Sequence, residues 1–187
     1  MKKSYLAAVI IFFLILISIF ITIAPTFFTK GVSRVSLHQN IDLSLILDTP
    51  KEIELVFFGY AGCTDICTPR LHNIAEWYQQ SIYKDEVQVR FLDISRPYDT
   101  FLPQLFAASF NKEFIGVYLK EDFLREYTKE FSVYFARSFR DEHEFDHTAN
   151  LYLLKRSKNF KELRYIYSAY PYDFKQITAD IEELIHE

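Results

Sequence analysis

An uncharged apolar segment from Tyr5 to Ala24 restricts this chain more than any other feature of its sequence. As a helix rising 1.5 Å per residue, the segment would be about 30 Å long, the thickness of a bilayer's hydrocarbon core. A helix pairs its own backbone N–H and C=O groups, so it tolerates lipid. The segment is longer than the apolar part of a usual signal peptide, and no clear small-residue cleavage site follows it. We therefore predict an uncleaved membrane anchor within residues 1–28, with cleavage as the alternative.

The charges around this segment predict its orientation. Lys2 and Lys3 precede it, and the positive-inside rule keeps such residues in the cytoplasm. Lys30 and Arg34 follow the segment and reduce the bias. The sequence predicts a single-pass protein of the cytoplasmic membrane whose C-terminal domain lies on the periplasmic side, in an oxidising compartment.

Composition narrows the class of the remaining chain. A length of 187 residues suits one ordinary domain with a short appendage. Half of the residues are hydrophobic and 25% are charged, which excludes disordered and low-complexity architectures. A net charge of -4 gives no electrostatic footprint for nucleic acid. The only methionine is Met1, so soft-ligand chemistry depends on the two cysteines, Cys63 and Cys67.

Hydrophobic patterning predicts an α/β fold. A tether leads into the domain over residues 29–50, with its first part running from Phe27 to about Leu37, and one domain follows over residues 51–187. Five segments have the pattern of strands: Ile53–Tyr60, Val87–Ile94, Phe114–Leu119, Thr148–Leu154 and Leu163–Tyr170. Four have helical spacing: Ile66–Ile82, Phe101–Phe110, Lys120–Phe131 and Phe174–Ile185. The alternation predicts a mostly parallel sheet flanked by helices, which a terminal hairpin makes mixed.

The two cysteines mark the candidate site. Cys63 and Cys67 lie where the first buried strand ends and a helix begins, the usual address for ligands in open α/β sheets. A helix N-terminus also favours a thiolate. Residues four apart share one face of a helix, so both sulfurs could face one metal ion or each other. The C-x-x-x-C spacing favours metal binding over thiol–disulfide exchange, because redox sites of that kind usually have C-x-x-C. A structural disulfide and two inert thiols are the alternatives.

A nitrogen ligand would complete such a site, and the chain offers five histidines. A lone histidine is more often a hydrogen-bonded surface residue than a ligand. We expect His72 and His186 on the surface, His38 has no distinguishing context, and replacing His143 should change copper binding little. His147 stands in Asp146-His147-Thr148, just before a predicted strand, from which its side chain could project over the sheet.

These residues together resemble the SCO/SenC family of copper-binding proteins. The likeness covers the chain from about Glu52 onward and rests on Phe58-Gly59-Tyr60-x-x-Cys63-x-Asp65-x-Cys67-x-Pro69 with Asp146-His147 downstream. It implies a thioredoxin-like fold behind one transmembrane helix, and one copper ion bound by Cys63, Cys67 and His147. It also implies a role in assembling the copper centre of a cytochrome oxidase subunit. Thr64 and Thr68 stand where the family commonly has proline.

The chemistry of the donors agrees with copper. Thiolates select Cu(I), zinc or iron–sulfur clusters, and Cu(I) tolerates three ligands, whereas structural zinc normally takes four. A Cys₂His zinc site with an open position is the alternative. Nearby acidic residues could attract a cation or simply form a solvated loop, and Asp65 could cap the helix that carries Cys67. The acidic residues are Asp65, Glu142, Glu144 and Asp146.

The function favoured by the sequence is a copper chaperone that transfers metal without turnover. The alternative is a thiol–disulfide oxidoreductase that reduces the copper-ligating cysteines of the oxidase subunit, and a copper or redox sensor is a third class. No Ser/His/Asp set, glycine-rich phosphate loop or paired-carboxylate site suggests another enzyme.

Overall fold

The computed structural model describes residues 11–20, 33–41, 50–95, 99–139, 144–157 and 160–187. The chain divides into two compact units, Met1–Ser33 and Arg34–Glu187. In the first unit, residues 11–20 are helical and expose their apolar side chains. The predicted anchor Tyr5–Ala24 extends beyond the described residues at both ends. Among the described residues, no helix is long and apolar enough to cross a membrane.

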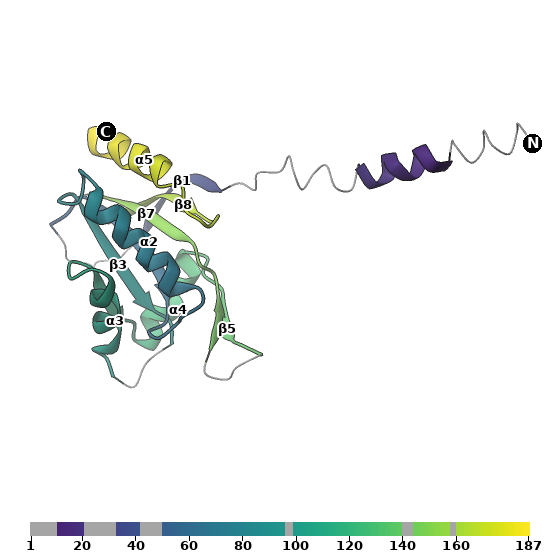
Figure 1. The fold of residues 1–187 in the computed structure, drawn as a ribbon. Helices are drawn as coiled ribbons and strands as arrows, with labels where there is room; N and C mark the ends of the chain where they lie inside the picture. Colours follow the sequence, from purple (N-terminus) through teal and green to yellow (C-terminus); the bar gives the residue numbers. More distant parts are fainter. Residues whose placement is uncertain (1–10, 21–32, 42–49, 96–98, 140–143, 158–159) are drawn as a thin grey trace, which may run out of the picture. The chain divides into compact units, whose positions relative to one another are not determined.

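The second unit is built on a six-stranded mixed sheet (Figure 1). The strand order is β1-β8-β7-β2-β3-β4. The strands at its centre are fully buried and rich in aliphatic and aromatic residues, as expected for strands covered on both faces. The bounds are β1 Arg34–Ile41, β2 Ile53–Gly59, β3 Val87–Asp93, β4 Ile115–Tyr118, β7 Leu151–Arg156 and β8 Lys161–Tyr167. A separate two-stranded sheet pairs β5 (Phe135–Arg137) with β6 (Phe145–His147).

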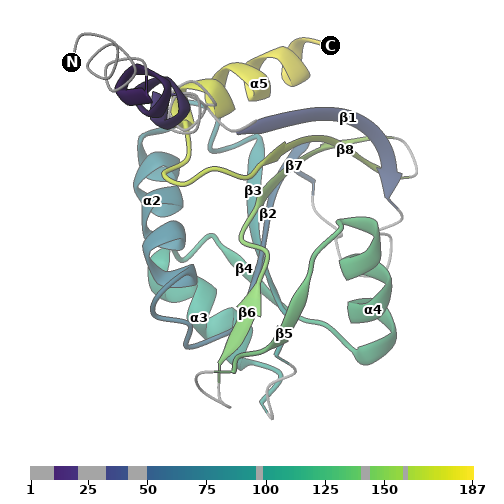
Figure 2. The same ribbon diagram turned by 90° about the vertical axis from the view of Figure 1, so that its right-hand side faces the viewer.

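Helices cover both faces of the large sheet (Figure 2). On one face lie α2 (Cys67–Gln80) and α3 (Leu102–Phe110), and on the other lies α4 (Glu121–Glu130). Next to α4, the ring of Phe131 packs 5.1 Å from that of Phe58 on β2. The last helix, α5 (Phe174–His186), joins α2 through Trp77, whose indole stacks on Phe174 and donates a hydrogen bond to Thr178.

The sequence predicted this α/β architecture and the type of nine elements, but it overstated the parallel pairing. Only β2–β3 and β3–β4 are parallel, whereas the pairs β2–β7, β7–β8 and β1–β8 are antiparallel. The C-terminal hairpin adds to the side of β2 opposite β3, so it brings antiparallel strands into the middle of the sheet. Alternation of strands and helices predicts parallel pairing only for strands that helices connect.

Strand β1 lies in the segment for which a tether was expected. Arg34–Ile41 pairs with β8 along the edge of the sheet. Arg34 donates two hydrogen bonds to the buried carboxylate of Asp180 on α5, at 2.7 and 2.8 Å. The burial pattern of β1 is mostly exposed or half-buried, so its sequence lacks the apolar run that revealed the central strands.

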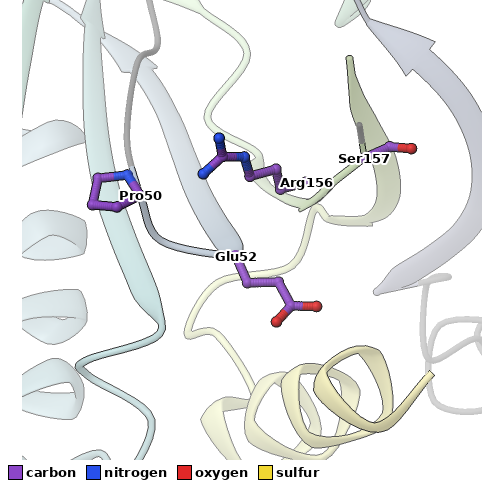
Figure 3. Close-up of a pocket in the computed structure, with 4 residues that line it drawn as sticks. All are labelled: Pro50, Glu52, Arg156 and Ser157. Carbon is purple, nitrogen blue, oxygen red and sulfur yellow. The ribbon is translucent and has the colours of Figure 1, made fainter. Parts of the chain in front are cut away.

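One hollow lies at the end of β2 that is opposite the two cysteines. Its described lining consists of Pro50, Glu52, Arg156 and Ser157 (Figure 3). These residues precede β2 and end β7, whereas Cys63 and Cys67 follow the other end of β2. The Arg156 amide donates to the Glu52 carbonyl at 2.7 Å, so the hollow is framed by strand pairing.

Candidate metal centre

A tight turn, not a shared helix face, brings the two cysteines together. Cys63 lies in the turn between β2 and α2, and its amide donates to the carbonyl of Tyr60 at 3.1 Å. Thr68 anchors the other side, donating to the Cys63 carbonyl from its amide at 3.2 Å and from its hydroxyl at 2.7 Å. Cys67 is the first residue of α2. The cysteines thus lie at the junction of strand and helix that the sequence predicted, but a turn rather than the i, i+4 spacing of a helix makes their sulfurs converge.

The Cys63 sulfur also accepts a hydrogen bond at the start of α2. The Cys67 amide, one of the N-terminal groups without an intrahelical partner, donates to Cys63 Sγ at 3.3 Å. The expected cap, Asp65, does not fill this role: the cap position is Ile66 and has no side-chain cap, while Asp65 accepts from the Thr64 hydroxyl at 3.1 Å. A sulfur at a helix N-terminus is stabilised as a thiolate by these N–H groups.

His147 reaches the sulfurs from the small β5–β6 sheet. It is the last residue of β6 and pairs with Phe135, so it ends its own short strand rather than preceding β7 directly. Its Nε2 lies 3.5 Å from Cys67 Sγ, and its Nδ1 lies 3.0 Å from the Thr148 carbonyl oxygen. Because a carbonyl only accepts, this contact places the ring proton on Nδ1 and leaves the Nε2 lone pair facing the sulfurs.

The structure thus brings Cys63, Cys67 and His147 into one group whose candidate ligand atoms all lie within 4.8 Å of one another. The cysteines are almost fully buried, and the histidine is half-buried. The set offers two soft sulfurs and one imidazole nitrogen, with access from the histidine side. Such a group suits an ion that accepts three protein ligands.

The other described histidines lie elsewhere. His72 is 67% exposed and pairs with Glu76 at 3.5 Å, as expected for a surface residue. His38 on β1 contacts Glu162 at 2.8 Å. His186 ends α5, and His143 lies outside the described residues.

The two thiols differ in acidity because they share a hydrogen bond. Donation from Cys67, together with the backbone N–H groups of Cys67 and Ile66, lowers the pKa of Cys63 against the opposing effect of burial. The same shared bond, with burial, raises the pKa of Cys67. Of the two thiols, Cys63 is therefore the more acidic. A metal ion that binds both sulfurs displaces the protons that they carry.

Two neighbours of the site have roles that the sequence did not suggest. Gly59 ends β2 directly beneath the site: a Cβ atom there would lie 2.5 Å from Cys67 Sγ. Tyr60 is nearly buried, and its ring packs edge-on to His147 with centroids 6.0 Å apart and 5.5 Å from Phe145. A glycine in an apolar strand often marks a place where another group lies close to the backbone, and this signal could have identified Gly59 from the sequence.

Comparison with known families decides where this arrangement belongs. The SCO1/SenC family model matches residues 48–186, which include all three candidate ligands. The chain belongs to the SCO1/SenC family. A SCO2-like protein of Rickettsia conorii is 27% identical over 121 residues, which are 62% of this chain and 58% of that protein. This SCO1/SenC chain thus spans about three fifths of the length of that relative.

Solved structures of SCO proteins share the fold. Apo Sco1 of Thermus thermophilus superposes with a TM-score of 0.60 at 23% identity, covering 83% of this chain and 95% of that one. Arabidopsis thaliana ScoI with copper bound gives a TM-score of 0.59 at 20% identity, covering 72% of this chain and 84% of that one. At these identities the likeness establishes the thioredoxin-like fold expected from the family resemblance.

Proposed function

We propose that this SCO1/SenC protein is a membrane-anchored copper chaperone that holds one copper ion through Cys63, Cys67 and His147. The observation that carries the proposal is the convergence of these three donors within 4.8 Å. Copper is the cargo, and the protein releases it to a cytochrome oxidase subunit that carries a copper centre, as the family resemblance implies. No covalent chemistry on a substrate is required.

Copper fits the donor set better than zinc does. Two thiolates and an imidazole are a common ligand set for copper, and Cu(I) tolerates three ligands. A structural zinc site would need a fourth ligand, and the described residues bring no other His, Cys, Asp or Glu into this group. The half-buried His147 side leaves a route for the ion to be passed to a partner. The copper-bound Arabidopsis ScoI, which shares the fold, also supports copper as the cargo.

Membrane attachment is part of the proposal. The support is the uncharged segment Tyr5–Ala24 behind Lys2 and Lys3, together with the exposed apolar side chains of helical residues 11–20. A periplasm-active reporter fused after Glu187 should be active, and a cytoplasm-active reporter at the same place should be silent. Replacing Ile15 and Leu16 with arginines should release the fusion from the membrane fraction. Activity of the cytoplasmic reporter would contradict this topology.

A thiol–disulfide oxidoreductase is the second candidate, and one observation favours it. The two cysteines are not joined in a disulfide, and their sulfurs lie within 4.8 Å of each other, which favours exchange through a disulfide. Oxidation to the disulfide would remove two electrons and two protons, which a disulfide in the client would accept. That activity needs only the cysteines, whereas copper binding also needs the imidazole.

His147→Ala separates the two functions. If copper transfer is the task, this variant should lose oxidase assembly nearly as completely as Cys63→Ser, while it still forms and reduces its disulfide. The reason is that one of three donors is lost and both sulfurs remain. The measurement is oxidase activity in a deletion strain complemented with each variant at low copper. Full activity of His147→Ala would reject copper transfer in favour of thiol reduction.

A further inference from the structure

Next to the three donors lies a buried carboxylate that none of the steps above uses. Asp93 ends β3 and is fully buried. In the parallel pair of β2 and β3 it stands beside Gly59, and Cys67 Sγ lies directly over Gly59. Neighbouring strands are about 4.8 Å apart, and residues in register on the two strands face the same side. The carboxylate is therefore a neighbour of the Cys67 sulfur.

The hydrogen bonds of Asp93 indicate its charge. One oxygen accepts from the Ala61 amide at 2.8 Å, and the other accepts from the Ser95 amide at 2.7 Å and the Ser95 hydroxyl at 2.6 Å. Each oxygen thus faces an N–H group that can only donate, which suits an ionised carboxylate. Burial raises the pKa of Asp93, and these three hydrogen bonds oppose that effect.

Within the described parts of the chain, no Lys, Arg or His forms an ion pair with Asp93. The Asp93 carboxylate lies beside Cys67 Sγ across Gly59. A buried negative charge favours a positive ion next to it, and buried charges are screened little by salt.

We propose that Asp93 is a positioning and specificity-determining residue that biases the metal centre toward the doubly charged ion, Cu(II), over Cu(I). The inference rests on the proposed copper site. Its physical basis is that a fixed negative charge interacts about twice as strongly with a charge of two as with a charge of one. Asp93 also holds the turn that carries Cys63, through the Ala61 amide. Positioning alone would affect both ions alike, so the ratio of the two affinities separates charge from structure.

The test compares Cu(I) and Cu(II) affinities of the full chain, each measured by competition with a chelator of known affinity. In Asp93→Asn, the affinity for Cu(II) should fall at least tenfold more than that for Cu(I). By the thermodynamic cycle, a tenfold change in the ratio raises the reduction potential of the bound copper by about 59 mV. An equal loss of both affinities, or an unchanged ratio, would overturn the inference.

Two further variants serve as controls. Ser95→Ala removes the hydroxyl hydrogen bond to Asp93 but leaves the charge of Asp93. The ratio of Cu(II) affinity to Cu(I) affinity should therefore stay within about twofold of that of the unmodified chain, or rise. If Ser95→Ala lowered this ratio as Asp93→Asn is expected to do, the position of the Asp93 side chain and not its charge would set the preference between the two ions. Asp65→Asn removes an exposed acid between the cysteines, and water should keep its effect below about twofold. If the unmodified chain binds neither ion, the proposed function itself fails. If it binds both and Asp93→Asn keeps their ratio, only this inference fails.

Discussion

Replacing Cys67 with serine should lower the affinity for Cu(I) by more than about a hundredfold, beyond the 10–100-fold typical of changes outside the ligand shell. A hydroxyl is a hard, protonated group and does not replace a soft thiolate. Cys63→Ser should have a similar effect, and it should also weaken the start of α2, because Cys63 Sγ accepts from the Cys67 amide. Anaerobic competition with a chromophoric Cu(I) chelator measures both variants.

The matched control for these variants is His72→Ala. His72 is an exposed histidine on α2, the same helix as Cys67, and its loss should leave Cu(I) binding unchanged. His147→Ala should give an intermediate loss, because both sulfurs remain. If Cys67→Ser retained Cu(I) affinity within about tenfold of the unmodified chain, the ligand set proposed here would be wrong.

Gly59→Ala should damage the metal centre without changing any ligand. The added Cβ would lie 2.5 Å from Cys67 Sγ and 3.0 Å from the Phe91 ring, so the sulfur must move. Overpacking of this kind typically costs about 1–3 kcal/mol of unfolding free energy. We expect that loss in chemical denaturation, together with at least a tenfold loss of Cu(I) affinity, as for other changes around a metal site.

Ile181→Val provides a comparison for the stability effect. Ile181 is a fully buried residue of α5, and the substitution should cost about 0.5–1.5 kcal/mol through a small cavity. It should leave the affinity of the folded protein for Cu(I) unchanged. Normal Cu(I) affinity in Gly59→Ala would mean that Cys67 Sγ does not lie over β2 as the structure places it.

The elements that the sequence predicted well are those with a continuous apolar run or a clear helical spacing of apolar residues. The apolar run of β2 and the amphipathic spacing of α5 were recognised to within a residue or two of their ends. The edge strand β1 and the short strands β5 and β6 were missed. β5 and β6 have three residues each, too few for a period of two to be recognised, and β1 is only partly buried.

The candidate ligands were named from sequence, but the reasons for their convergence were not. Cys63 and Cys67 were expected at the start of a helix, where the i, i+4 spacing would align them, whereas a turn held by Thr68 brings them together. His147 was selected chiefly through the family resemblance, supported by its place just before a predicted strand. Asp93 was not recognised, because the sequence does not reveal which residue of β3 lies beside Gly59 in register.

The order of strands in the sheet has a consequence for the timing of metal loading. Strand β2, which leads to both cysteines, lies between β3 and β7, and β7 begins only at Leu151. His147 also follows Cys67 by 80 residues. During synthesis both thiols therefore emerge long before their imidazole partner and before one flank of their own strand exists. The complete three-donor group of the proposed copper site therefore forms only after His147 has been made and β7 has joined the sheet.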